Sequence, residues 1–204
     1  MLKTLSSDWS NNKKRTTKYV HEFIETIMNK AIFLDRDGVI NGVIFRNGNN
    51  LKPIAPWSLK EFYLIHDIEE PLLNLSKSGF KLFIVTNQPD IAKGVINQSF
   101  VEKINEIILK KLPIDEIKVC PHIDLDGCEC RKPKSGMITS LAKKWDIDCK
   151  ESFMIGDTWK DIESGKKTCA TTILLEKHYN RSVHADYRAS NLSQAVEIIN
   201  QLAG

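Results

Sequence analysis

Short apolar runs alternate with amphipathic segments along most of this chain, and this alternation limits the possible folds more than any other feature. The runs resemble buried strands in length and content, whereas the intervening segments carry apolar residues three and four positions apart, as helices do. Strands are expected at residues 31–35, 81–87, 114–122, 152–157 and 171–175. Helices are expected at residues 67–79, 98–112, 136–146, 159–167 and 191–203. This order predicts an α/β fold, a Rossmann-like doubly wound parallel sheet with helices on both faces.

Bulk properties favour a cytoplasmic protein that acts on small molecules. The chain has 204 residues and a formal net charge of +3, which is too small to indicate nucleic acid or an anionic membrane as a partner. No apolar run approaches the roughly 18 residues that span a bilayer. The N-terminus also lacks the apolar core of a secretory signal.

The length suits one domain with a short addition in front of it. We expect the domain to cover residues 29–204 and residues 1–28 to form an N-terminal extension. From Thr17 to Asn29, apolar residues recur every three to four positions, which predicts an amphipathic helix. Such a helix offers a face for docking or for weak self-association, although a monomer is the expected state.

Polar side chains stand at the carboxyl ends of the predicted strands. In an open parallel sheet, ligands bind beyond these ends, so the polar residues there should share one rim. The residues expected on this rim are Asp35, Asp37, Thr86, Asn87, Gln88, Arg131, Lys132 and Asp157. The rim therefore combines three carboxylates with a hydroxyl, two amides and two cations.

The rim residues suit a metal ion together with a phosphate. The three aspartates offer the oxygen ligands that Mg²⁺ prefers, and a cation would offset the repulsion between them. Arg131 and Lys132 suit an anion such as phosphate. Taken singly, each motif has a plainer explanation as a turn, an exposed loop or a helix cap. Together at successive strand ends, they indicate an enzyme that works through an aspartyl phosphate.

Four segments, FLDRDGVIN, IVTN, CRKPKSGM and MIGDTWKD, resemble in order and spacing the motifs of the haloacid dehalogenase superfamily of phosphohydrolases. The resemblance runs from about Asn29 to the C-terminus. It implies that Asp35 attacks phosphorus, and that Asp37 protonates the leaving oxygen and then activates water. It further implies that Mg²⁺ binds the side chains of Asp35 and Asp157 and the backbone carbonyl of Asp37. No insertion between the motifs is long enough for a large cap domain.

The same resemblance implies how the phosphate is held. Thr86 and Lys132 would bind the phosphoryl oxygens, and Asn87 and Gln88 belong to the same substrate-binding stretch. Asp161 would orient Lys132 or a metal-bound water. An ordinary surface position on its helix is the equally weighted alternative for Asp161.

A cluster of sulfur and imidazole ligands precedes the rim lysine. Its members are Cys120, His122, Cys128 and Cys130. The spacing C-x-H-x5-C-x-C is typical of a closed, structural zinc site with four protein ligands. This zinc-binding loop ends directly at Arg131-Lys132 and should hold those cations at the phosphate. Cys149 and Cys169 lie elsewhere and are expected to be buried small apolar residues.

The zinc loop followed by CRKPK narrows the resemblance to two groups, the D-glycero-D-manno-heptose 1,7-bisphosphate 7-phosphatases and the histidinol-phosphate phosphatases. The stretches TNQPDIAKG and KSGM are closer to the heptose group. They imply hydrolysis of the 7-phosphate of a heptose bisphosphate, on the route to activated heptose for cell-surface glycans such as lipopolysaccharide. Arg131 would contact this substrate beyond its reacting phosphate. Histidinol phosphate or another small sugar phosphate is the alternative.

Two further classes are less favoured. A polynucleotide 3′-phosphatase should carry a stronger basic face than a net charge of +3 provides. A non-catalytic binding protein should lack one of the reactive residues Asp35, Asp37 or Lys132, all of which are present.

The segment after DGVIN departs from the family pattern. The family usually carries there a short stretch ending in a Gly-Tyr pair that borders the substrate, whereas residues 42–60 of this chain differ. Arg46 and Lys52 are available for a second phosphate, with solvated loop charges as the alternative. We expect this loop to close over the substrate. The identity of the sugar is therefore left open by the sequence.

Overall fold

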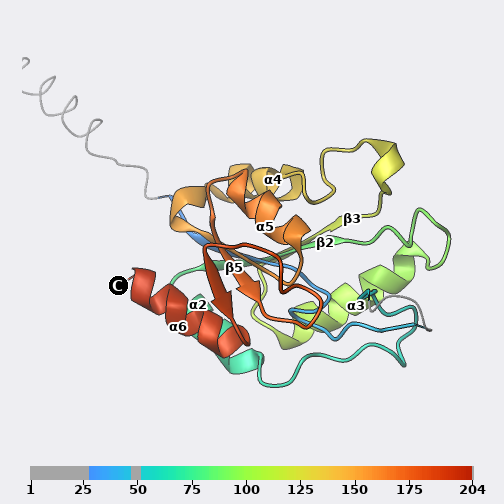
Figure 1. The fold of residues 1–204 in the computed structure, drawn as a ribbon, viewed down its shortest axis with the longest axis horizontal. Coiled ribbons are helices and arrows are strands. Elements are labelled where there is room, and N and C mark those ends of the chain that lie inside the picture. Colours follow the sequence, from blue (N-terminus) through green and yellow to red (C-terminus); the bar gives the residue numbers. More distant parts are fainter. Residues whose placement is uncertain (1–27, 47–51, 204) are drawn as a thin grey trace, which may run out of the picture.

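The computed structural model describes residues 28–46 and 52–203 (Figure 1). The helix predicted from Thr17 to Asn29 lies almost wholly outside the described residues. Asn29, at its end, instead forms an isolated parallel bridge with Ile147. None of the helices in the described part of the chain is long and apolar enough to cross a membrane.

A six-stranded parallel sheet forms the centre of the fold. Its strands are β1 (Ala31–Leu34), β2 (Lys81–Asn87), β3 (Glu116–Cys120), β4 (Phe153–Gly156), β5 (Thr171–Leu175) and β6 (Tyr187–Ala189). Their order across the sheet is β3-β2-β1-β4-β5-β6. The five predicted strands are confirmed. The edge strand β6 was not predicted, because it is three residues long and only Ala189 in it is buried, so it leaves no apolar run in the sequence.

Helices cover both faces of this sheet, as predicted. The α-helices are α2 (Glu69–Lys77), α3 (Gln98–Lys111), α4 (Gly136–Trp145), α5 (Trp159–Lys166) and α6 (Leu192–Ala203), and two short 3₁₀ helices span Asp124–Asp126 and Cys149–Glu151. In Figure 1, α4 and α5 lie on one side of the sheet, and α2, α3 and α6 lie on the other.

Strand β1 shows why the strands appear in the sequence as continuous apolar runs. Ile32 and Leu34 pack into the larger apolar cluster, which also contains side chains from α2, α3 and α6. Ala31 and Phe33 point the other way and pack with side chains from α4. Because helices cover both faces, all four residues are fully buried, and the half-polar alternation of an exposed strand is absent from β1.

The strand order places a crevice beside β1. The chain runs outward from β1 through β2 to β3 and then returns to add β4 on the other side of β1. Leu34, the last residue of β1, pairs with Ile84 of β2 and with Ile155 of β4. Connections leave in opposite directions at such a switch point, so the strand ends there are left open to a ligand.

The segment between β1 and α2 lies beside this crevice. Ile44 and Ile54 form an antiparallel bridge. Trp57 donates its indole N–H to Asp90 Oδ2 at 2.9 Å. The Arg46 guanidinium stacks 3.9 Å from the centre of the Trp57 ring. The Trp57–Asp90 hydrogen bond joins this segment to the loop after β2, and the other two contacts lie within the segment. Residues 28–46 and 52–68 contain no cap domain.

Candidate active site and metal centre

Asp35 follows directly after β1 and meets Lys132 in the crevice. Lys132 Nζ lies 2.8 Å from Asp35 Oδ1 and 2.6 Å from Asp161 Oδ1. Burial raises the pKa of Asp35 well above its usual range, and Asp161 adds to this effect while Lys132 opposes it. Burial alone would lower the pKa of Lys132, but the two carboxylates outweigh it and raise that pKa. The lysine therefore stays protonated beside the predicted nucleophile.

The Asn87 side chain positions Lys132 by binding the backbone of the lysine. The Asn87 amide donates to the Lys132 carbonyl at 2.9 Å and accepts from the Lys132 N–H at 3.0 Å. The Asn87 side chain, at the end of β2, thus makes the two hydrogen bonds to the Lys132 backbone that a residue of a neighbouring strand would make. This contact brings the segment after the cysteine cluster to the end of the sheet.

Asp161 is fully buried, so the surface position considered for it is wrong. It stands in the first turn of α5, where its Oδ2 accepts from the backbone N–H of Thr158 at 2.9 Å and from the Thr158 hydroxyl at 2.6 Å. Its other oxygen faces Lys132. The close approach of α5 depends on Gly156, because a Cβ at that position would lie 2.1 Å from Asp161 Cβ.

Asp157, after β4, supplies the second carboxylate of a candidate cation site. One oxygen each from Asp35, Asp157 and Asp161 lie within 4.8 Å of one another. Asp157 Oδ1 is buried and has no hydrogen-bond partner among the described residues. Burial, with Asp161 adding, raises the pKa of Asp157 to about 7. An unpartnered buried oxygen within a carboxylate cluster is the arrangement that Mg²⁺ satisfies, so the residues present fit this cation.

Asp37 has a different set of partners from Asp35. The Arg36 guanidinium lies 3.2 Å from Asp37 Oδ1. Asn41 donates to the same oxygen at 2.9 Å, and Gln88 donates to Oδ2 at 2.6 Å. Arg36 is fully buried. The negative charges of the two neighbouring aspartates therefore have separate partners. Lys132 lies against the Asp35 carboxylate, and Arg36 and two side-chain amides bind the Asp37 carboxylate.

The remaining predicted rim residues lie around the same crevice. Thr86 is buried, and its hydroxyl accepts from the Gln88 amide at 2.9 Å. Arg131 lines the cavity but is also bound to its own loop, through Asp124 at 2.6 Å and the His122 carbonyl at 3.0 Å. The structure thus brings every predicted rim residue to one end of the sheet. Asn87, Gln88 and Arg131 already have partners within the protein.

The crevice is a cavity of about 210 Å³. It is lined by Asp35, Asp37, Lys132, Asp157 and Asp161, and by Val43, Pro53, Ile54 and Ala55 from the segment after β1. Lys93 and Lys160 add two further cations to its lining. A larger surface hollow of about 1060 Å³ lies between residues 62–71, α3 and α6, and it contains none of the predicted site residues.

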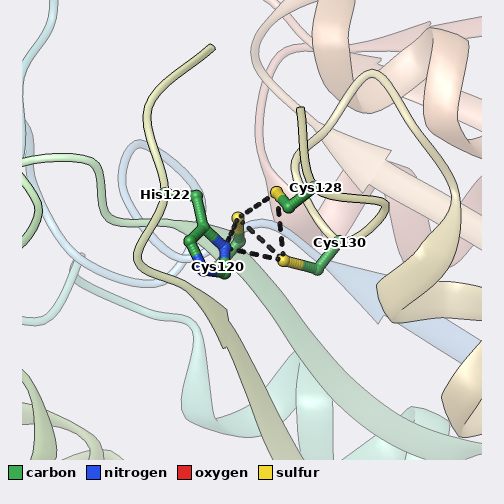
Figure 2. A group of neighbouring side chains, drawn as sticks. All are labelled: Cys120, His122, Cys128 and Cys130. Carbon is green, nitrogen blue, oxygen red and sulfur yellow. Dashed lines mark hydrogen bonds between the residues drawn. The ribbon is translucent and has the colours of Figure 1, made fainter. Parts of the chain in front are cut away.

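The cysteine cluster converges as predicted (Figure 2). Its ligand atoms are separated by distances such as 3.1 Å from Cys130 Sγ to Cys120 Sγ, 3.3 Å from His122 Nδ1 to Cys130 Sγ, and 3.7 Å from Cys120 Sγ to Cys128 Sγ. All four atoms lie within 4.8 Å of one another. Tetrahedral bonds of about 2.3 Å to one ion would separate sulfur ligands by roughly 3.7 Å. The donor set and its spacing therefore fit zinc.

The other two cysteines differ from the prediction. Cys149 is half-buried and Cys169 is exposed. Cys169 lies in the turn between α5 and β5 and has a left-handed backbone with φ of 62°. The prediction of burial was wrong for Cys169, because it relied on residue type, whereas this residue lies in an exposed turn. Cys149 is partly buried against the smaller apolar cluster.

Four residues near the site were given no role on the basis of the sequence. They are Arg36, Asn41, Tyr179 and Asn180. Arg36 and Asn41 bind Asp37, and Tyr179 and Asn180 bind Asp157. A cation between two acids was a usable hint for Arg36. Tyr179 and Asn180 follow β5, and their position after a strand end was the signal that could have indicated a role at the site.

Gly38 allows a close approach that a side chain would block. Its φ is +93°, and a Cβ there would lie 2.0 Å from Asp157 Oδ2. Gly79 has a similar φ of +87° with nothing within 4 Å, so it is a matched control for backbone strain. We expect Gly79→Ala to cost about 1–2 kcal/mol in the free energy of unfolding, and Gly38→Ala to cost clearly more and to abolish the Mg²⁺-induced rise in melting temperature. Urea unfolding of both variants measures the difference, and equal losses would contradict the steric explanation.

Comparison with known proteins identifies relatives along most of the chain. The family model described as polynucleotide kinase 3 phosphatase matches residues 43–199. The D-glycero-alpha-D-manno-heptose-1,7-bisphosphate 7-phosphatase of Campylobacter jejuni is 36% identical over 151 residues, covering 72% of this chain and 81% of that protein. The D-glycero-beta-D-manno-heptose-1,7-bisphosphate 7-phosphatase of Helicobacter pylori strain J99 is 33% identical over 178 residues, covering 84% of this chain and 97% of that protein.

A solved structure has the same fold. The D,D-heptose 1,7-bisphosphate phosphatase from B. bronchiseptica, complexed with magnesium and phosphate, matches with a TM-score of 0.72 at 24% identity. The match covers 85% of this chain and 99% of that chain.

The parallel sheet, the carboxylates at its switch point and the buried lysine between them match the site predicted for a phosphatase of the haloacid dehalogenase class, and the two sequence relatives above are phosphatases. The predicted superfamily and enzyme class are thus confirmed. The chain belongs to the polynucleotide kinase 3 phosphatase family, and both of the sequence relatives described above are named D-glycero-D-manno-heptose-1,7-bisphosphate 7-phosphatases.

Proposed function

We propose that this phosphatase removes the 7-phosphate of a D-glycero-D-manno-heptose 1,7-bisphosphate. The observation that carries the chemistry is the buried contact of 2.8 Å between Lys132 Nζ and Asp35 Oδ1, beside the unpartnered oxygen of Asp157. The choice of substrate is supported by the relatives of Campylobacter jejuni and Helicobacter pylori, which carry this activity in their names.

Asp35 and Asp37 have different roles in the reaction. Asp35 forms a bond to phosphorus, and Asp37 gives its proton to the departing sugar oxygen. Asp37 then takes a proton from the water that cleaves the aspartyl phosphate, which releases inorganic phosphate and restores Asp35. Arg36, Asn41 and Gln88 keep Asp37 in place for both steps.

Several groups compensate the negative charge of the phosphoryl group. Lys132 and Thr86 bind the phosphoryl oxygens, and Asp161 and Asn87 hold Lys132. Asp35, Asp157 and the Asp37 carbonyl would hold Mg²⁺, which would supply further positive charge to stabilise the transition state. Preorganised charges of this kind are commonly the largest contribution to catalysis.

The cysteine cluster has a structural part in this proposal. With four protein ligands, a zinc ion there has no open position for chemistry. The loop that it closes continues into Arg131 and Lys132, and Arg131 is tied back to that loop by Asp124. A zinc ion held by these four residues would position the phosphate-binding Lys132, and Arg131 would contact the substrate beyond the reacting phosphate.

We further propose a cytoplasmic, monomeric enzyme in a pathway to activated heptose for cell-surface glycans. Its catalytic domain covers residues 29–204, and residues 1–28 form an N-terminal extension. The four-ligand cysteine site supports a reducing compartment, because thiolate ligands would otherwise be lost to disulfides. A net charge of +3 supports a small phosphorylated sugar, rather than nucleic acid or a membrane, as the partner.

A substrate screen tests the activity directly. With Mg²⁺ present, we expect release of the 7-phosphate from D-glycero-D-manno-heptose 1,7-bisphosphate with a kcat/KM at least ~100-fold above that for histidinol phosphate. Both anomers are included, because the two relatives named above differ in anomer. Assay of released phosphate, with NMR to identify which phosphate remains, gives the result.

The same screen contains the competing activities. A DNA oligonucleotide with a 3′-phosphate represents the function in the name of the matching family model. Preferred turnover of that oligonucleotide or of histidinol phosphate would overturn the heptose assignment. Loss of release in Asp37→Asn shows that a measured activity belongs to this site and not to a contaminant.

A further inference from the structure

Tyr179 makes the one side-chain hydrogen bond that Asp157 has among the described residues. It lies in the connection between β5 and β6, and its hydroxyl donates to Asp157 Oδ2. The other oxygen, Oδ1, is buried and lacks a hydrogen-bond partner within the described part of the chain. The two oxygens of Asp157 are thus unequal: the tyrosine holds one, and the other is free to bind a cation.

The backbone around Tyr179 is held tightly to the end of β4. Asn180 donates to the Asp157 carbonyl at 2.8 Å and to the Leu175 carbonyl at 2.7 Å. It also accepts from the Lys177 N–H at 2.9 Å, and its side chain is buried. This network links the β5–β6 connection to the residue that carries the carboxylate. Tyr179 therefore reaches Asp157 from a support that does not depend on the metal.

The ring of Tyr179 contacts the segment that follows β1. Its centre lies 6.1 Å from that of Phe45 and 5.1 Å from that of His178. Phe45 and His178 are themselves 5.4 Å apart. Phe45 immediately follows Ile44, which pairs with the cavity-lining residue Ile54. The aromatic cluster of Phe45, His178 and Tyr179 thus connects the substrate side of the cavity to the Asp157 carboxylate.

We propose that Tyr179 is a positioning residue for the catalytic cation: its hydroxyl fixes the Asp157 carboxylate so that Oδ1 faces the metal, and Phe45 holds the tyrosine in place. This inference rests on the proposed function, because it takes Asp157 as a ligand of Mg²⁺. Partners in the outer shell of a metal site restrict ligand orientation, and their loss typically weakens metal affinity 10–100-fold. A carboxylate has enough lone pairs to accept the tyrosine and bind a cation together.

Tyr179→Phe tests the hydroxyl alone, because the ring and its aromatic contacts remain. We expect Mg²⁺ binding, measured by calorimetry without substrate, to weaken about tenfold or more. Turnover should recover at saturating Mg²⁺, since Tyr179 touches neither substrate nor nucleophile in this scheme. Tyr187→Phe is the matched control, because Tyr187 lies in the edge strand β6 and is 37% exposed. It should bind Mg²⁺ as the wild type does.

The outcomes separate this inference from the function on which it rests. Asp157→Asn should lose Mg²⁺ binding altogether. If it does so while Tyr179→Phe binds Mg²⁺ with unchanged or higher affinity, the positioning role is wrong and the metal site stands. If Asp157→Asn still binds Mg²⁺ normally, both the metal assignment and the positioning role are overturned. Unchanged zinc content and circular dichroism exclude misfolding as the cause of any loss.

The connection through Phe45 has its own test. Phe45→Ala should weaken Mg²⁺ binding by severalfold in the wild-type background, because Tyr179 loses a neighbour that restricts its ring. In the Tyr179→Phe background, the same substitution should have no further effect, since no hydroxyl is left to position. If the double variant instead loses Mg²⁺ affinity by the product of the two single losses, the two residues act independently. That result would contradict the link between the substrate-side segment and the metal site.

Discussion

Replacing Asp35 with Asn is expected to abolish phosphate release, lowering kcat by on the order of 10⁴-fold or more. The amide has nearly the same shape but cannot attack phosphorus. Lys132 keeps Asp161 as a partner at 2.6 Å, so the substitution does not leave an isolated buried cation. Folding and zinc content should therefore be retained. A phosphate-release assay, with zinc content and thermal unfolding measured on the same preparation, gives the answer, and retained turnover would refute the nucleophile assignment.

Asp37→Asn is the matched control for the two roles. The Asp37 carboxylate is held by Arg36, Asn41 and Gln88 and does not bind Lys132. We expect this variant also to lose turnover but to retain its nucleophile. Because Asp37 also protonates the leaving oxygen, the test uses an aryl phosphate, whose leaving group departs without a proton. Acid quenching followed by mass spectrometry should then detect a phosphorylated protein in Asp37→Asn and none in Asp35→Asn. The reverse pattern would exchange the two roles.

Loss of one zinc ligand should have the largest effect on stability. The apparent free energy of zinc binding to such a site is on the order of 10 kcal/mol. We therefore expect Cys128→Ser to lower the zinc content to well below one ion per chain, and to reduce the free energy of unfolding by more than about 3 kcal/mol. Metal analysis and chemical denaturation measure the two quantities together. A chelator should have the same effect on the wild-type protein.

Cys169→Ser supplies the control for this substitution. Cys169 is exposed and lies outside the cluster, so the change should leave both zinc content and stability as they are. If Cys128→Ser behaves in the same way as Cys169→Ser, the cluster is not a metal site. Activity of Cys128→Ser should fall as well, because the zinc loop leads directly to Arg131 and Lys132.

Most of the fold could be predicted from the sequence, because its elements follow local patterns. β1, with both faces covered, appears as an unbroken apolar run, and α3 shows buried residues at Val101, Ile104 and Ile108. β6 could not be predicted, since it has a single buried residue and exists through pairing with β5. Secondary structure that depends on a distant partner leaves little local signal.

The site could be predicted in part for the same reason. Asp35 and Asp157 were predictable because each directly follows an apolar strand. The environment of Asp161 was not, because its burial depends on α5 lying against Gly156, which has no side chain to keep the helix away. Tyr179 was not predicted either, since nothing in its neighbourhood resembles a metal-binding motif.

By itself, the sequence determined the alternation of strands and helices, the rim at the strand ends and the spacing of the cysteine cluster. All of these follow from residue order over short distances. Only the tertiary structure decided which groups compensate the two neighbouring aspartates and what holds the metal-binding carboxylate. Asp37 meets Gln88 from 51 positions away, and Asp157 meets Tyr179 from 22 positions away. Such contacts arise when packed helices and strands bring separate loops together, and no pattern along the chain records that packing.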